Sequence, residues 1–201
     1  MLVDFTSISP REAYPWLIGA ITPRPIAWVS TISASGMTNL APFSFFQGIG
    51  ANPPTLMFSV LNDRTGKKKD TTINVEQVPE FVVNLVPYAL REPMNLSSTA
   101  LPHGESEFDR FAIAHAPSIH VRPPRVALSP VALECKVAQI VRLGEGPLAG
   151  NAVFGTVLCA HVSEAVLTDG TIDPHKLDTI GRLGGDTYSR TTELFSLPRP
   201  A

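Results

Sequence analysis

Hydrophobic and polar positions in the first half of the chain form short extended segments, each bounded by proline or glycine turn signals. The segments are rich in β-branched and aromatic residues, which favour strands. The link Pro23-Arg24-Pro25 separates the first two segments and cannot be helical. The pattern therefore predicts strands at 17–22, 26–33, 38–43, 55–61 and 80–86.

The longest strand-like runs lie in the second half of the chain. In 131–142, Leu133 and Val137 belong to an apolar face, while Glu134 and Lys136 fall on the other. This alternation predicts one buried face and one face in contact with water. A mostly apolar run at 151–168 follows the glycine-rich loop 144–150, so the two runs are expected to pair.

A hairpin centred near Pro147 would place Cys135 opposite Cys159 on the apolar face. Two interpretations fit this pair: a redox couple, or two small buried side chains in a reducing compartment. The second interpretation is favoured, because free cysteine is commonly a buried apolar residue.

Helical signals are short and few. They predict helices at 70–77, where Asp70 and Thr71 suit a helix start, and at 89–98 and 106–111. Proline makes up 19 of the 201 residues, which argues against a helix bundle. A doubly wound parallel sheet would require a helix after most strands. The expected fold is therefore mainly β, a barrel or sandwich with a few short helices.

The length predicts one domain covering 1–201. Residues 101–130 form a proline-rich excursion with Pro123-Pro124 near its middle. Apolar residues such as Phe108 and Ile113 still require burial there, so the excursion is expected to cover the domain and not to link two domains.

Charge and hydropathy exclude several classes. The net charge is −2, too balanced for general attraction to nucleic acid. The first residues lack the features of a signal peptide, and no apolar run is long enough to span a membrane. A cytoplasmic protein is the expectation.

Familiar catalytic layouts are missing from the sequence, including metal-binding and phosphate-loop motifs. His115 and His120 are separated by Pro117, which prevents one helix face from presenting both to a metal. No metal site is predicted.

Two local features point to a ligand. Lys67-Lys68-Lys69 runs into the expected helix start at Asp70, and such a cationic loop with free backbone N–H groups suits a phosphate; a solvated lysine loop is the alternative. Pro42 interrupts the apolar segment 39–47, which leaves a strand edge open to a flat heteroaromatic ligand or makes it an edge strand closing the core.

The ordered set of motifs resembles the flavin reductase-like FMN-binding split-barrel family, in particular its flavoredoxin-type branch. The motifs are Pro23-Arg-Pro-Ile-Ala-Trp-Val-Ser-Thr31, Asn39-Leu-Ala-Pro-Phe-Ser-Phe-Phe46, Asn52-Pro-Pro54, Lys69-Asp-Thr71, Glu80-Phe-Val-Val-Asn84 and Arg182-Leu-Gly-Gly185 with Tyr188. The resemblance covers about 14–197 and implies a Greek-key split β-barrel that forms a homodimer with flavin near the interface.

The resemblance also implies the cofactor site. The strand from Asn39 would lie against the flavin ring, with backbone amides of Ala41, Phe43 and Ser44 at its polar edge, while Lys69 and its neighbours would surround the phosphate. The implied FMN-binding residues are Arg24, Ser30, Thr31, Asn39, Leu40, Ala41, Pro42, Phe43, Ser44, Ser59, Arg64, Lys69, Asp70 and Thr71. Further candidates for the flavin or substrate face are His161, Arg182, Gly184, Gly185 and Tyr188. For His161 a purely structural packing role is favoured, and the glycine pair equally suits a turn.

The implied activity is an FMN-dependent oxidoreductase that takes hydride from NADH or NADPH and passes electrons to a monooxygenase or another acceptor. Because the cofactor carries the chemistry, no catalytic side chain is required. The alternatives are an FMN-binding electron carrier or sensor without nicotinamide turnover, and a split-barrel dimer that binds no flavin.

Overall fold

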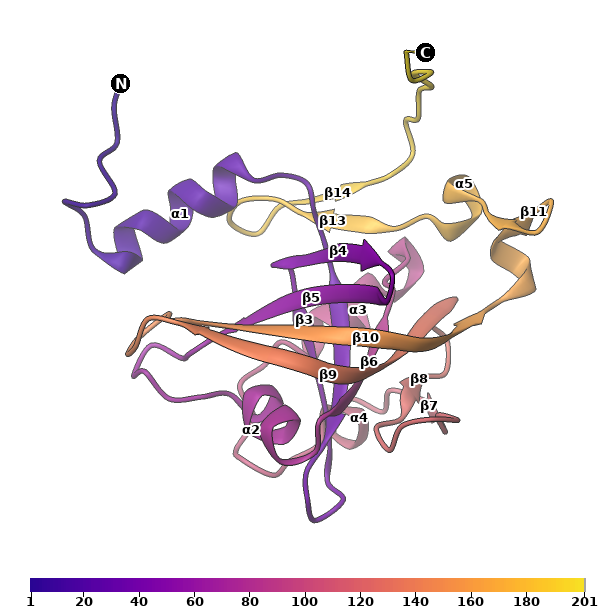
Figure 1. Ribbon diagram of the computed structural model, residues 1–201, viewed down its shortest axis with the longest axis horizontal. Coiled ribbons are helices and arrows are strands. Elements are labelled where there is room, and N and C mark those ends of the chain that lie inside the picture. Colours follow the sequence, from indigo (N-terminus) through magenta and orange to yellow (C-terminus); the bar gives the residue numbers. More distant parts are fainter. Residues whose placement is uncertain (201) are drawn as a thin grey trace.

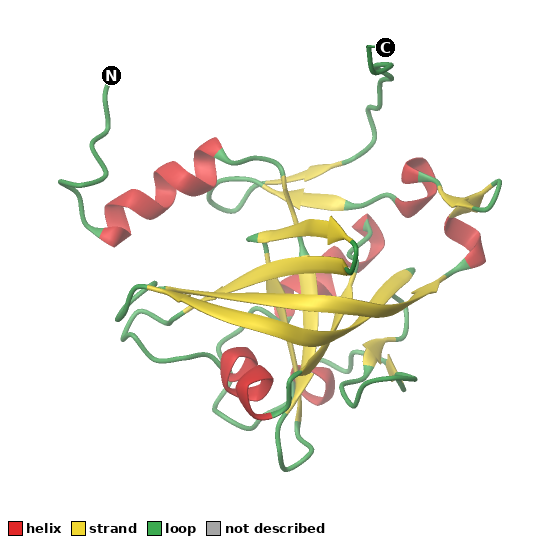
Figure 2. Ribbon diagram, viewed as in Figure 1, coloured by secondary structure: helices red, strands yellow, loops and turns green. Residues whose placement is uncertain are grey.

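The computed structural model describes residues 1–200 as a rolled β-sheet with short helices around it (Figures 1 and 2). The strands are β1 (Arg24–Pro25), β2 (Ala27–Ile32), β3 (Thr38–Phe43), β4 (Phe46–Ala51), β5 (Pro54–Leu61), β6 (Glu80–Asn84), β7 (His115–Ala116), β8 (Arg125–Val126), β9 (Val131–Leu143), β10 (Gly150–Val162), β11 (Leu167–Thr168), β12 (Thr171–Ile172), β13 (Ile180–Arg182) and β14 (Tyr188–Arg190). The helices are α1 (Pro10–Ala20), α2 (Asp70–Gln77), α3 (Arg91–Leu96), α4 (Glu107–Arg110) and α5 (Pro174–Leu177), with 3₁₀ turns at Tyr88–Leu90 and Glu164–Val166.

One antiparallel sheet of seven strands, in the order β3-β2-β6-β9-β10-β5-β4, forms the barrel. The sheet curls so that strands far apart in this order meet. The ring centroids of Phe43 on β3 and Phe58 on β5, for example, lie 5.5 Å apart. Phe58 in turn packs edge-on against Phe81 of β6, at 5.1 Å. Gly155 on β10 leaves the room for Phe81, since a Cβ there would lie 2.3 Å from the Phe81 ring. The mainly β prediction is confirmed.

A second hydrophobic cluster lies outside the barrel wall, under the proline-rich excursion. Trp28 and Leu40 face outward from β2 and β3 and pack with Met94, Phe108 and Ile113, all of them buried. The excursion therefore covers the barrel as expected.

The predicted strand at 17–22 is wrong. Residues up to Ala20 belong to α1, whose start is fixed by a capping box in which Ser9 and Glu12 bond each other's backbone N–H groups. Pro10 occupies the first helical turn, where proline is tolerated. Capping here outweighs the β-branched composition of the following residues. The helices expected at 70–77, 89–98 and 106–111 appear as α2, α3 with its preceding 3₁₀ turn, and α4.

The hairpin of β9 and β10 forms, but two expectations about it are wrong. Register shifts along β10 place Cys135 opposite Val157, while Cys159 faces Glu134. Glu134, expected on the wet face, is fully buried, because the excursion covers that face. Both cysteines are free thiols, and burial raises the pKa of Cys135 to about 12. A redox pair does not form in this structure.

Within residues 1–200, no helix combines the length and apolar character that crossing a membrane requires.

Candidate functional site

Strand β3 is an edge of the barrel sheet and supplies one wall of the site. The backbone N–H of Leu40 points away from β2, because it donates to the carboxylate of Glu107 at 2.8 Å. Antiparallel alternation then directs the N–H groups of Ala41 and Phe43 toward β2. The expectation that these two amides face a flavin is therefore wrong, and Ser44, just past the strand, is the remaining amide of the three.

A pocket of about 330 Å³, here called the lysine pocket, lies between β3, the start of α2 and the loop after α3. It brings together sequence-predicted residues from distant segments. The residues that line it are Asn39, Ala41, Pro42, Phe43, Asp63, Lys67, Lys68, Lys69, Asp70, Thr71, Ser97, Ser98, Thr99, Ala100, Leu101, His103 and Glu107.

Helix α2 starts at this pocket. The N–H groups of Thr72 and Ile73 bond the carbonyl of Lys69, so those of Asp70 and Thr71 precede the first intrahelical bonds. Lys69 is the N-cap residue and makes no side-chain cap. The helix start thus offers two backbone donors and the positive end of the helix dipole to the pocket.

The charges in the lysine pocket are unequally available. Lys68 is bound to Glu76 at 2.7 Å, whereas Lys69 makes no ion pair within the described residues. Desolvation in the pocket lowers the pKa of Lys69, although part of the side chain stays exposed. The carboxylate of Asp70 accepts from Nδ1 of His103 at 2.6 Å. Lys69, at the helix start, and Lys67, which likewise makes no ion pair within the described residues, are therefore the lysines left to meet an anionic ligand.

A second pocket of about 320 Å³, the middle pocket, adjoins the first and shares Pro42 and Ser98 with it. The residues that line it are Tyr14, Ile26, Pro42, Ser44, Met94, Asn95, Ser98, Arg182, Asp186 and Tyr188. Arg182 stacks on the Tyr188 ring, with its guanidinium carbon 4.4 Å from the ring centroid. The two pockets together form a groove along β3 with cations at both ends.

Arg24 supports the groove from behind and does not line it. It is buried and donates to the carbonyls of Ile18 (2.5 Å) and Leu183 (2.9 Å), and to the hydroxyl of Ser44 (3.3 Å). Arg24 therefore holds α1, the β13–β14 turn and Ser44 together. Gly184 packs at this junction and Gly185 has φ of +58°, so the pair forms the turn.

Other predicted residues lie behind the walls or elsewhere. Ser30 and Thr31 are fully buried; the Ser30 hydroxyl donates to the carbonyl of Pro124, and Thr31 accepts from Asn39 at 3.2 Å. Thr31 thus positions a pocket residue. The predicted residues that line neither pocket are Arg24, Ser30, Thr31, Leu40, Ser59, Arg64, His161, Gly184 and Gly185.

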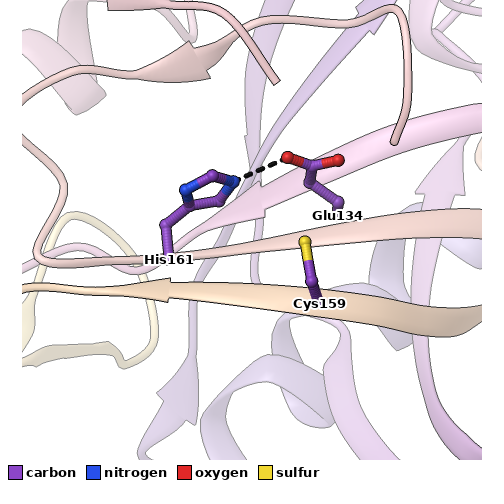
Figure 3. Close-up of side chains that lie close together, drawn as sticks. All are labelled: Glu134, Cys159 and His161. Carbon is purple, nitrogen blue, oxygen red and sulfur yellow. Dashed lines mark hydrogen bonds and ion pairs between the residues drawn. The ribbon is translucent and has the colours of Figure 1, made fainter. Parts of the chain in front are cut away.

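His161 belongs to a separate cluster on the outer face of β9 and β10 (Figure 3). Its Nε2 lies 2.6 Å from Oε1 of Glu134, and Cys159 lies beside them. The same carboxylate accepts from the backbone N–H groups of Ile119 (2.7 Å) and His120 (2.6 Å). Two ligands of one tetrahedral zinc would be about 3.3 Å apart. The His161 contact is therefore a hydrogen bond between β9 and β10, and the bonds from Ile119 and His120 fasten the excursion to the barrel.

Sequence reasoning missed Glu107, the serines after α3, and Asn95. Burial raises the pKa of Glu107, although the bond from Leu40 N–H opposes the shift. Glu107 lies in the helix predicted at 106–111 inside the proline-rich excursion, and no motif there marks it as a site residue. Only the fold brings this segment to β3.

Several solved structures are similar to this chain over nearly its whole length. Nitrilotriacetate monooxygenase component B from Bacillus cereus is similar over 98% of each chain, with 31% identity and a TM-score of 0.93. Pseudomonas fluorescens 2-nitrobenzoate 2-nitroreductase is similar over 100% of this chain and 96% of its own, with 28% identity and a TM-score of 0.89.

A protein of Shewanella frigidimarina, described as a flavin reductase with a split barrel domain, covers 100% of both chains with a TM-score of 0.84 and 24% identity, a likeness that shows the fold. The model of the flavin reductase like domain matches residues 19–174. The chain therefore belongs to the flavin reductase-like family, with the split-barrel fold and a flavin-related redox role.

Proposed function

We propose that the protein is an FMN-dependent oxidoreductase that accepts hydride from NADH or NADPH and passes electrons to a separate acceptor. The observation that carries the proposal is the groove along β3, in which a cationic helix start and an aromatic, hydroxyl-bearing pocket lie end to end. Volumes of about 330 and 320 Å³ fall in the usual range for ligand sites.

The lysine pocket fits a phosphate. Lys69 supplies a positive charge, and the N–H groups of Asp70 and Thr71 supply backbone donors. The hydroxyls of Ser98 and Thr99 on the same wall donate to the carbonyls of Asn95 and Leu96. Asn39 reaches the pocket from β3, held by Thr31 and Thr71.

The middle pocket fits the ring of the flavin. Pro42 leaves the outer edge of β3 without an N–H, Ser44 offers its amide and hydroxyl, and Tyr188 offers an aromatic face. When bound, FMN would supply the chemistry of hydride and electron transfer, and the chain would orient the ring and exclude water.

For the electron acceptor, the proposal names a chemical class. Two similar proteins are named as a monooxygenase component and a nitroreductase, which supports a partner monooxygenase or a small reducible aromatic compound. A cytoplasmic location would give access to NADH and NADPH.

Titration with FMN tests the proposal. Binding should quench flavin fluorescence and raise the melting temperature, because a ligand that binds only the folded state stabilises it. Anaerobic addition of NADH or NADPH to the loaded protein should then bleach the flavin. A protein that binds FMN without bleaching would be a carrier or sensor, and one that binds no FMN would contradict both functions.

We propose that the protein forms a homodimer through α1. This helix buries none of its residues, and Trp16, Leu17 and Ile21 are 46%, 43% and 57% exposed. In Figure 1, α1 stands away from the barrel beside β13 and β14. Since Tyr14 of α1 also lines the middle pocket, a dimer would place flavin near the interface.

Light scattering should give twice the mass of one chain. Leu17→Asp should lower this mass to that of a monomer, because a charge would be buried in the interface. Leu128→Asp is the control, since this residue is 71% exposed and lies on the excursion. A parent protein that is monomeric at all concentrations would contradict the dimer.

A further inference from the structure

A third pocket continues the groove beyond the middle pocket. This arginine pocket has a volume of about 450 Å³ and lies between α3, with its preceding 3₁₀ turn, and the β13–β14 pair. It shares Met94, Asn95 and Tyr188 with the middle pocket. Its own walls include Tyr88, Arg91 and Arg190. A molecule bound here would lie next to the proposed flavin ring.

Two guanidinium groups are held in place at this pocket. The guanidinium carbons of Arg91 and Arg190 lie 4.2 and 4.1 Å from the centroid of the Tyr88 ring. Arg190 is also fixed by two bonds to Asp178, at 2.7 and 2.8 Å. Stacked and bonded guanidinium groups lose little freedom when a ligand binds.

Both arginines retain donors for a ligand. Of the five N–H groups of a guanidinium, Arg190 uses two for Asp178 and Arg91 uses two, for the carbonyl of Tyr88 and for Glu92. Each arginine is paired with one carboxylate, Arg91 with Glu92 of the pocket wall and Arg190 with Asp178 outside the lining, so each offers a ligand its remaining N–H groups. Planar forks of this kind bind carboxylate and phosphate oxygens in pairs.

The rest of the pocket is apolar. Met94 and Ile180 are 1% and 5% exposed and form buried walls, and Leu96 and the rings of Tyr88 and Tyr188 add to the lining. Apolar walls that include aromatic side chains suit an aromatic ring, whereas the arginines suit an anionic group attached to it.

We infer that the arginine pocket binds a planar aromatic anion beside the flavin site, with Arg91 and Arg190 as its recognition residues. Two sources share this chemistry: an aromatic carboxylic acid that serves as acceptor, and a phosphate-bearing nicotinamide nucleotide that serves as donor. The placement beside the flavin ring rests on the proposed function, but the pocket and its arginines do not.

Calorimetric titration tests the inference with benzoate, NADH and NADPH as probes, on the flavin-free and the FMN-loaded protein. Arg91→Gln and Arg190→Gln should each lower the affinity for whichever probe binds by about tenfold, the effect of losing a charge-assisted contact. Both variants should keep the parent FMN affinity, and Arg190→Gln should lower the melting temperature slightly because it loses the two bonds to Asp178. Arg142→Gln is the matched control, because Arg142 is an exposed arginine paired with Glu76 outside the pocket.

Each result of these titrations either supports or overturns the site. Arginine-dependent binding of benzoate identifies an aromatic acid, and arginine-dependent binding of NADH or NADPH alone identifies a nucleotide; both support the site. Failure of all three probes to bind, or affinities unchanged in both variants, overturns it. Arginine-dependent binding to a protein that takes up no FMN supports the site and contradicts the proposed function.

Discussion

Glu134→Ala is expected to lower the free energy of unfolding by about 3 to 5 kcal/mol. The carboxylate is fully buried and accepts from Nε2 of His161 and from the backbone N–H groups of Ile119 and His120. Removing it leaves three donors without their acceptor under the covering excursion. Urea unfolding measures the loss as a lower midpoint at unchanged slope.

Two variants serve as controls for this loss. Glu134→Gln should cost less, because the amide keeps one oxygen acceptor and the size of the side chain. Glu145→Ala, at an exposed position in the β9–β10 loop, should change stability by less than about 0.5 kcal/mol. A loss below about 1 kcal/mol for Glu134→Ala would show that the excursion does not depend on this carboxylate.

Acid provides a second readout on the same variant. Desolvation raises the pKa of Glu134, but the bonds from His161, Ile119 and His120 outweigh it and hold the pKa below its usual value. The resulting stabilisation is complete above the unfolded pKa of about 4.3 and is lost as pH falls through the lower folded pKa. The difference between parent and Glu134→Ala should therefore narrow below about pH 4.

The barrel strands were predictable because strand propensity and burial in the core favour the same residues. β2, β5 and β6 carry β-branched and aromatic residues bounded by turn signals, and burial against Phe58 and Phe81 agrees with that composition. Local and tertiary preferences coincide there. In α1 they do not, because the capping box of Ser9 and Glu12 starts a helix whose apolar residues find no core in the chain itself.

Alternation identifies the two faces of a strand, but it does not reveal what covers them. Glu134 and Leu133 alternate as expected, yet the excursion converts the polar face into a buried one. The pairing of Cys135 with Val157 depends on register shifts that no sequence pattern announces. Tertiary packing determines which face of a strand is covered and which register two strands adopt.

The residues of the candidate site were likewise predictable only in part. Asn39, Pro42 and Lys69 to Thr71 came from contiguous motifs, and the structure brings them to one pocket. Arg24, Ser30 and Thr31 belong to the motif at 23–31 but lie one layer behind. Arg24 and Thr31 hold Ser44 and Asn39 of the groove, whereas Ser30 bonds the carbonyl of Pro124. A motif marks a neighbourhood, and only the fold separates lining residues from supporting ones.

Lys69→Ala is expected to weaken the binding of FMN about tenfold or more while leaving riboflavin affinity nearly unchanged. A charge-assisted contact contributes roughly 1.5–3 kcal/mol, and only FMN carries the phosphate. The exposed part of the Lys69 side chain argues for the lower end of this range. Fluorescence titration with both flavins measures the two dissociation constants.

Lys68→Ala is the matched control, since its ammonium group is committed to Glu76 at 2.7 Å. It should lose little affinity for either flavin. The ratio of FMN to riboflavin affinity is the decisive quantity, because a general distortion of the groove would weaken both ligands alike. Equal losses for the two flavins in Lys69→Ala would move the phosphate away from the start of α2. A loss restricted to FMN would place the phosphate at the start of α2, as the proposed orientation with the ring toward Tyr188 requires.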